Sequence, residues 1–173
     1  MRLVRVPLFP AGVAVGAVVT LLLAGYSGRA SDAATFHCSP SQPVPHSGAR
    51  PFSAAGFNYG NTLLRAELPP HGHLIAGTLP NGGSMAEIEP DGSISTKMGW
   101  WRGLQGRLVI SGRRLDKDAA PLRVDLPSLN SYGATGFIPS SLMFPTTGCW
   151  RVSGKLGRAR LSFTLSVTKV PHP

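Results

Sequence analysis

The amino-acid sequence predicts an all-β domain, an antiparallel β-sandwich of seven to eight short strands. Three observations support this fold class. The 173 residues include 16 prolines and 21 glycines, which disfavour long helices. Apolar and polar residues alternate in several segments, as they do in strands with one buried face. Turn signals separate these segments at intervals of roughly ten residues, and no core helix is indicated after residue 30.

Residues 1–30 have the layout of an export signal. Arg2 and Arg5 supply the positive start, and an uncharged apolar run follows over residues 8–25. Because that run is close to the shortest helix that spans a bilayer, two outcomes stay open. Either the signal peptide is cleaved and the domain is released, which we favour, or residues 8–25 remain in the membrane as a signal-anchor helix. Both outcomes give an extracytoplasmic domain, secreted or membrane-anchored by its N-terminus.

Residues 22–25 (LLAG) resemble the start of a bacterial lipobox, the motif in which the next residue is the cysteine that receives a lipid. Tyr26 occupies that position in this chain, and a phenol cannot form the thioether. Lipid attachment at this position is therefore excluded. Small residues instead favour ordinary cleavage after Ala30 or Ala33.

The rest of the chain divides into a lead-in and a domain. Residues 31–61 are rich in Ser, Pro, Gly and Ala, which predicts an irregular lead-in to a β-sandwich domain over residues 62–173. A Pro-Asp-Gly turn at residues 90–92 is a strong boundary between strands. The strand candidates are residues 62–68, 73–78, 107–112, 121–126 and 136–144, followed by a closing hairpin.

The closing hairpin shows the clearest alternation in the chain. Trp150 and Val152 share one face of its first arm. The apolar residues on one face of the second arm are Leu161, Phe163, Leu165 and Val167. Since this period of two is what a half-buried strand requires, we expect both sets to enter the core.

Two cysteines follow the export signal, Cys38 and Cys149, and an even count in an exported chain predicts one disulfide. The alternative is a metal-binding or catalytic thiol, but no His or second Cys flanks Cys149 at ligand spacing. Cys149 is adjacent to Trp150, so their side chains point to opposite faces of one strand. If Trp150 enters the core, the disulfide ties the lead-in across the outer surface of the sheet.

The formal net charge is +9, and an excess of basic residues remains after the export signal is set aside. Such a surface favours anionic partners in general, such as lipid head groups or envelope polymers. The basic residues of the closing hairpin are Arg151, Lys155, Arg158 and Arg160. They favour contact with an anionic polymer; the alternative is a solvated edge whose charges prevent edge-to-edge pairing of chains. No nucleic-acid partner is expected.

The most aromatic point of the chain is the pair Trp100 and Trp101. On a strand, adjacent tryptophans point to opposite faces, so one can enter the core while the other is exposed. An exposed indole beside arginines suits stacking on a sugar ring or contact with a membrane interface. The candidate ligand-contact residues are therefore Trp100, Trp101, Arg102 and Arg107. In the alternative interpretation both tryptophans pack, one in the core and one beneath the lead-in.

No set of residues for catalysis, cofactor binding or metal binding is evident. The sequence has no G-x-S-x-G nucleophile motif and no glycine-rich loop that opens a helix. His71 and His73 share one face of a strand, but two imidazoles are too few for a tight metal site. We predict no enzyme, no cofactor and no metal site. A small hydrolase remains an alternative, because paired carboxylates can be dispersed along a sequence.

Two segments resemble an uncharacterised family of bacterial exported proteins and lipoproteins. They are WWRGLQGRLVISGRRLD at residues 100–116 and YGATGFIPSSLMFPTTGCWRVSGKLGRARLSFTLSV at residues 132–167. The family pattern is a tryptophan pair, then G-R-R-L-D, Y-G-x-T-G-F, F-P-T-x-G-C-W-x-V and a final L-x-F strand. The resemblance implies an immunoglobulin-like sandwich at the cell surface and no particular activity. Members often carry a lipobox, from which Tyr26 departs.

The sequence therefore leads us to expect an extracytoplasmic binding or structural domain at the bacterial cell envelope. Its expected contact is an anionic or sugar polymer. Two alternatives stay open: an accessory domain that binds another envelope protein, and the small hydrolase with dispersed carboxylates. If the export segment is not cleaved, residues 8–25 also contact the membrane.

Overall fold

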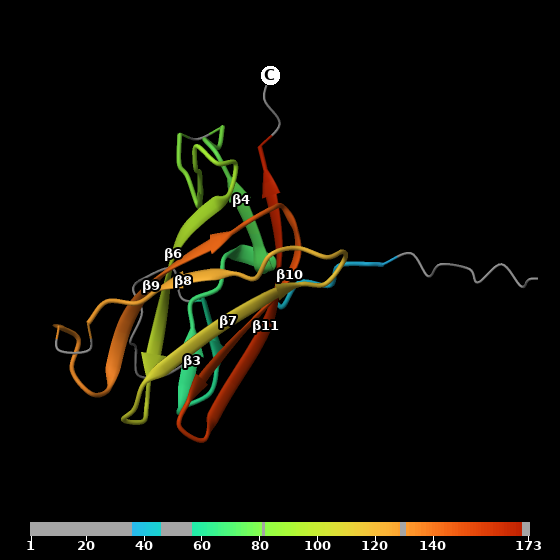
Figure 1. Ribbon diagram of the computed structural model, residues 1–173. Coiled ribbons are helices and arrows are strands. Elements are labelled where there is room, and N and C mark those ends of the chain that lie inside the picture. Colours follow the sequence, from blue (N-terminus) through green and yellow to red (C-terminus); the bar gives the residue numbers. More distant parts are fainter. Residues whose placement is uncertain (1–35, 46–56, 81, 129–130, 171–173) are drawn as a thin grey trace, which may run out of the picture. The chain divides into compact units, whose positions relative to one another are not determined.

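Two β-sheets make up the folded part of the chain (Figure 1). The computed structural model describes residues 36–45, 57–80, 82–128 and 131–170, which belong to the unit Thr35–Pro173. The helical element η1 (Pro70–Gly72) is a single 3-10 turn. The strands are β1 (Val44–Pro45), β2 (Phe57–Gly60), β3 (Leu64–Ala66), β4 (His73–Ala76), β5 (Glu87–Ile88), β6 (Ile94–Arg102), β7 (Leu108–Arg114), β8 (Arg123–Asp125), β9 (Gly136–Phe144), β10 (Gly148–Leu156) and β11 (Ala159–Lys169).

The larger sheet has seven strands in the order β1-β2-β3-β6-β9-β8, with β5 also paired to β6. All of its pairs are antiparallel. The longest pair joins β6 to β9, with Ile94 opposite Phe144 at one end and Arg102 opposite Gly136 at the other. This register brings the tryptophan pair beside the start of β9.

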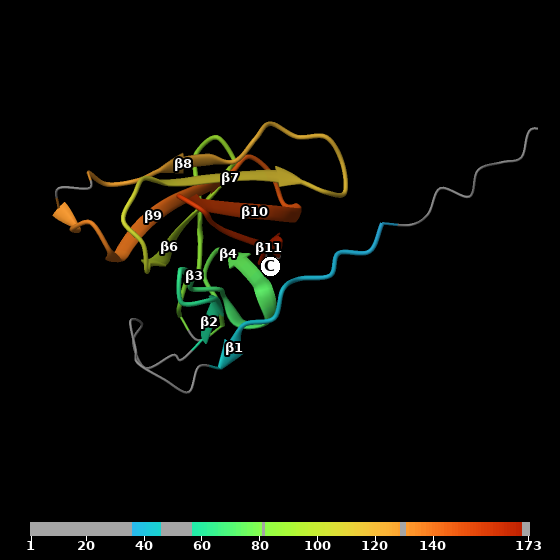
Figure 2. The same ribbon diagram turned by 90° about the horizontal axis from the view of Figure 1, so that it is seen from below.

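The smaller sheet has four strands in the order β4-β11-β10-β7. β10 pairs antiparallel with both β11 and β7, whereas β4 runs parallel to β11. β7 and β8 are the last strands of their respective sheets and lie side by side (Figure 2). The two sheets therefore come together along this edge.

The predicted alternation of the closing hairpin is confirmed. Trp150, Val152 and Leu165 are fully buried, and Phe163 is 2% exposed. Their neighbours Arg151, Lys155 and Arg160 are exposed on the opposite face. Each large apolar side chain buried in this way contributes about 1.5–3 kcal/mol to folding, so the hairpin is a main contributor to the core.

Aromatic side chains join the two sheets across the core. Trp100 of β6 packs against Phe163 of β11, with ring centroids 5.8 Å apart. Phe144 of β9 packs edge-on against Trp150 of β10 at 5.5 Å. The buried Trp100 indole donates a hydrogen bond to Ser140 Oγ at 3.1 Å, so its polar atom has a partner. These contacts position β6 and β9 against the closing hairpin.

The predicted disulfide is present: Cys38 and Cys149 are bonded, with Cα atoms 5.6 Å apart. Trp150 enters the core, so Cys149 points to the outer side of its strand, as its position in the sequence predicts. Past the disulfide, Ser41 continues the pairing of β11. Its N–H donates to the Thr164 carbonyl at 2.8 Å, and its hydroxyl accepts from the Thr164 N–H at 3.0 Å.

The fold differs from the predicted sandwich in two respects. The described residues form eleven strands rather than seven or eight, because short strands such as β1 and β5 are too brief to show a period of two. The sheets are also not wholly antiparallel, since β4 pairs with β11 in parallel. The predicted signal or anchor helix and Tyr26 lie outside the described residues. No helix within the described residues has the length and hydrophobicity that crossing a bilayer requires.

Candidate functional site

The four predicted ligand-contact residues do not form one surface. Trp100 and Arg102 are both 0% exposed. Trp101 lies between them on the outer face of β6 and is half-buried. Arg107 is exposed just before β7, in the other sheet. Trp101 and Arg107 are thus the two members that solvent reaches, and they belong to different sheets.

Arg102 acts within the fold. Its Nη2 donates hydrogen bonds to the carbonyl oxygens of Tyr132 and Gly133, both at 2.9 Å. Its Nη1 is buried and has no hydrogen-bond partner among the described residues. Burial lowers the pKa of Arg102 below its ordinary value. The guanidinium therefore ties the segment before β9 to the end of β6.

A small aromatic patch forms on the outer face of the larger sheet. Trp101 is directly opposite Phe137 in the β6–β9 register. Phe137 is 41% exposed and Tyr132 is 36% exposed. Their rings meet edge-on, with centroids 6.4 Å apart. Because Arg102 holds the Tyr132 carbonyl, the buried arginine also positions this patch.

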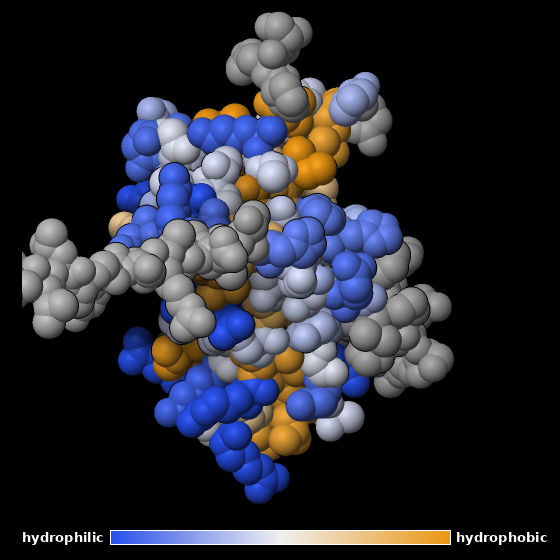
Figure 3. Space-filling model, turned by 90° about the vertical axis from the view of Figure 1, so that its right-hand side faces the viewer, coloured by the Kyte–Doolittle hydropathy of each residue, from blue (hydrophilic) through white to orange (hydrophobic). Residues whose placement is uncertain are grey.

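The densest positive charge lies on the outer face of the smaller sheet. We define the basic face as the four exposed residues Arg113, Arg151, Lys155 and Arg160. Figure 3 views this side of the molecule, and hydrophilic residues gather at its lower end, where the β10–β11 hairpin closes. The hairpin residues are evident from the sequence, whereas the place of Arg113 depends on how β7 pairs with β10.

Strand register puts like charges directly opposite each other on the basic face. Arg113 of β7 is the partner of Arg151 on β10. Lys155 of β10 is the partner of Arg160 on β11. Directly opposite residues have Cβ atoms about 4.5–5.5 Å apart, and like charges at that separation destabilise a sheet. This arrangement opposes folding locally, and a bound anion would relieve the repulsion.

A row of hydroxyl groups lies between the two basic pairs. Ser111, Ser153 and Ser162 are aligned across β7, β10 and β11. The Ser153 and Ser162 hydroxyls are 3.1 Å apart and hydrogen-bonded. Hydroxyls supply donors to anionic oxygens, so the face combines charge with directional hydrogen bonding.

Acidic residues are absent from this sheet. None of its four strands contains Asp or Glu. Asp116, the acid that follows β7, forms an ion pair with Arg114, whose Nη2 lies 2.7 Å from the carboxylate. Asp116 also accepts a hydrogen bond from the Cys149 N–H at 3.0 Å. Neither ion pair of the described residues involves the basic face, so its charges are available to a ligand.

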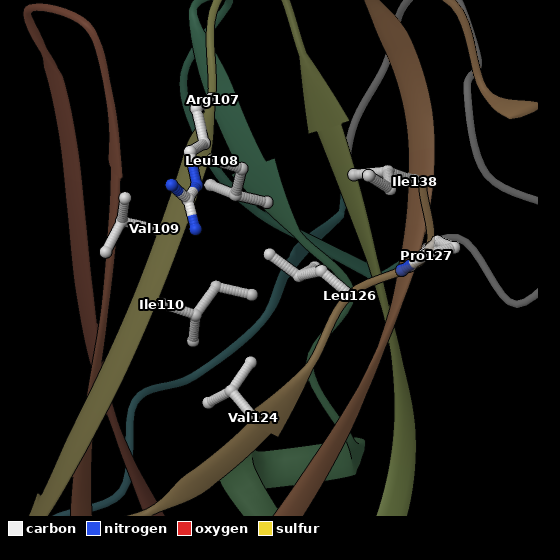
Figure 4. Close-up of a pocket in the computed structure, with 8 residues that line it drawn as sticks. All are labelled: Arg107, Leu108, Val109, Ile110, Val124, Leu126, Pro127 and Ile138. Carbon is white, nitrogen blue, oxygen red and sulfur yellow. The ribbon is translucent and has the colours of Figure 1, made fainter. Parts of the chain in front are cut away.

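An apolar groove opens between β7 and β8, at the edge where the two sheets meet. Its volume is about 370 Å³. Leu108 and Ile110 form one wall, and Val124 and Leu126 form the other (Figure 4). The Arg107 side chain lies at the mouth of the groove (Figure 4). No sequence signal indicates this groove, because its walls come from strands that are not paired to each other.

The histidines and carboxylates that the structure describes do not form a metal-binding cluster. Among the described residues no three His, Cys, Asp or Glu side chains cluster as they would around a metal ion. The His71 ring lies 3.3 Å from Gln42 Oε1. Asp91 accepts hydrogen bonds from the Ser93 N–H at 2.9 Å and from Arg123 at 3.1 Å. These groups stabilise turns.

We expect the free energy of unfolding to fall as the pH drops from about 4 to about 2. Hydrogen bonds from Ser93 lower the pKa of Asp91 from 3.8 to about 2. Hydrogen bonds from Arg114 lower the pKa of Asp116 well below its ordinary value. A depressed carboxyl pKa adds stability that is complete above the unfolded value and is lost as the pH falls through the folded value. Urea unfolding across this range measures the loss, and Asp116→Asn is expected to flatten it.

No family model matches the chain, and a search of curated proteins finds no similar sequence. Function is therefore inferred from the surfaces themselves. Three are accessible: the aromatic patch, the basic face and the apolar groove. Of these surfaces, the basic face carries the most charged residues, and strand register arranges them in two pairs.

Proposed function

We propose that this chain is an exported binding domain of the bacterial cell envelope that holds a linear anionic polymer on its basic face. In this proposal the domain is an immunoglobulin-like sandwich of the exported family that residues 100–167 resemble. A cleaved signal peptide or a signal anchor delivers it. It acts by binding and has no catalytic role.

The observation that carries the proposal is the paired register of Arg113 with Arg151 and of Lys155 with Arg160. Arg151 and Lys155 are four positions apart along β10, which corresponds to about 13 Å at the rise of a strand. The two pairs therefore suit a polymer with repeated anionic groups better than one small anion. The intervening hydroxyls of Ser153 and Ser162 suit the oxygen atoms between those groups.

The disulfide supports an extracytoplasmic location, since such bonds persist in oxidising compartments. The disulfide also stabilises the proposed binding surface. It holds the lead-in against β10, and Ser41 of the lead-in then bonds to β11, so both strands that carry most of the basic face are fixed.

Binding of poly(glycerol phosphate) to the full chain in mild detergent tests the proposal. We expect saturable binding that weakens steeply with added salt, because bound phosphates release counterions. Arg151→Gln with Lys155→Gln is expected to weaken binding about tenfold at low salt. The matched control is Lys97→Gln with Arg123→Gln, which removes the same charge from exposed positions of the larger sheet.

The control variant is expected to bind within about twofold of the wild type, since neither of its charges belongs to the basic face: Lys97 is on β6 and Arg123 is on β8. An equal loss of affinity in both variants would mean that net charge alone, and not the basic face, determines binding. Absence of saturable binding by the wild-type chain would refute the proposed function.

A further inference from the structure

β7 leaves one edge of the smaller sheet without a partner strand. It is the terminal strand of that sheet, and its other side pairs with β10. The Gly112 carbonyl points away from β10, since it accepts a hydrogen bond from the Leu122 N–H at 3.1 Å. Backbone groups alternate in direction along an antiparallel strand, so those of Leu108 and Ile110 point the same way. Within the described residues no strand pairs with this edge.

The free edge lies directly over the apolar groove. Leu108 and Ile110 supply both the outward backbone groups and one wall of the groove (Figure 4). The groove is near the lower limit of size for ligand pockets, which suits a few side chains of an extended peptide. An added strand would hydrogen-bond with its backbone to β7 and insert alternate side chains into the groove.

We propose that this edge accepts an extended segment of a partner protein whose residues alternate between apolar and acidic. The apolar side chains enter the groove between β7 and β8. The acidic side chains of the peptide lie on the outer side of the sheet, beside Val109, Ser111 and Arg113. Arg107 lies at the mouth of the groove. Arg107 and Arg113, the charges on the β7 side of this position, are both positive, so an acidic segment is complementary to that side. This site lies on the free edge of β7 rather than on the basic face, and the two share only Arg113.

A second copy of the chain is disfavoured when two β7 edges pair about Ile110. If two β7 strands paired antiparallel about Ile110, Arg107 of each copy would lie opposite Arg113 of the other. Like charges directly opposite destabilise a strand pair. Charges of this kind are a known protection of edge strands against self-association. In this register the edge repels its own sequence, whereas an acidic segment is attracted to the same arginines.

Two synthetic peptides test the proposal with the full chain in mild detergent. One alternates leucine with glutamate over seven residues, and the other alternates leucine with lysine. We expect the glutamate peptide to bind and the lysine peptide not to bind. Arg107→Gln is expected to weaken binding of the glutamate peptide about fivefold, whereas Lys155→Gln, an exposed charge of the basic face, has no comparable effect.

Amide hydrogen exchange provides the second measurement. The glutamate peptide is expected to protect the N–H groups of Leu108 and Ile110, and to leave those of Val109 and Ser111 unchanged because they already face β10. N-methylation of alternate peptide bonds is expected to abolish both protection and binding.

Three outcomes would overturn the proposal: binding that survives N-methylation, equal binding of the lysine peptide, or no binding of either peptide. Protection of Leu108 and Ile110 that rises with protein concentration alone would instead identify a second copy as the occupant. The poly(glycerol phosphate) result is independent of all of these outcomes, so the two proposals fail separately.

Discussion

Removal of the Cys38–Cys149 disulfide is expected to lower the free energy of unfolding by roughly 4–5 kcal/mol. The bridge joins residues 111 positions apart, and closing so long a loop restricts the unfolded chain strongly. A typical domain has about 5–15 kcal/mol of total stability, so this loss is large. Urea unfolding of the Cys38→Ala and Cys149→Ala variants measures it.

The double variant is the control for this prediction. Either single substitution already opens the loop, so the double variant is expected to lose about as much as each single one. Additive losses would show that the side chains contribute through packing rather than through the bond. Cys149 is 2% exposed, so some packing loss accompanies its replacement.

Trp100→Ala is expected to destabilise the protein by about 3–5 kcal/mol. The indole is fully buried between the sheets, and its removal also leaves the buried Ser140 hydroxyl without the donor. Thermal or urea unfolding measures the effect. The control is Lys155→Ala. Lys155 is exposed on the face of β10 that points away from the core, so its replacement is expected to change the free energy of unfolding by less than about 0.5 kcal/mol.

Gly154 provides a second test of the same contact. A Cβ at this position would lie 2.6 Å from an atom of the Trp100 ring, so the glycine makes room for the indole. Gly154→Ala alone is expected to destabilise by about 1–3 kcal/mol through overpacking. In a Trp100→Phe background the smaller ring is expected to remove much of that cost. Strict additivity in this double-mutant cycle would contradict the contact.

Local patterns in the sequence predict the core of the closing hairpin correctly. The period of two places Trp150 and Phe163 in the core, and it places Cys149, the neighbour of Trp150, on the outer face of the sheet. These inferences succeed because each depends on one strand alone. The same parity says that Trp100 and Trp101 face opposite ways, but not which of them is buried.

The parts that could not be predicted depend on contacts between distant segments. Arg102 is buried, which is rare for arginine, because carbonyl oxygens about thirty positions later in the chain accept hydrogen bonds from its guanidinium. Arg113 joins the basic face only through the β7–β10 register. The groove arises where two sheet edges meet, and no local pattern encodes that meeting.

The two proposed sites share β7. Its side that pairs with β10 carries Arg113 into the basic face, and its free edge borders the groove. Because Arg113 belongs to the basic face and also lies beside the proposed added strand, the two proposed ligands are expected to compete for its charge. The aromatic patch around Trp101 lies on the other sheet, outside both proposed sites.

The most direct test is to map by NMR which backbone amides of the full chain shift when poly(glycerol phosphate) is added. We expect the shifts to concentrate on the outward residues of β10 and β11, Arg151, Ser153, Lys155, Arg160 and Ser162, and on Arg113 of β7. Shifts centred instead on Trp101 and Phe137, or spread evenly over both sheets, would contradict the assignment of polymer binding to the basic face.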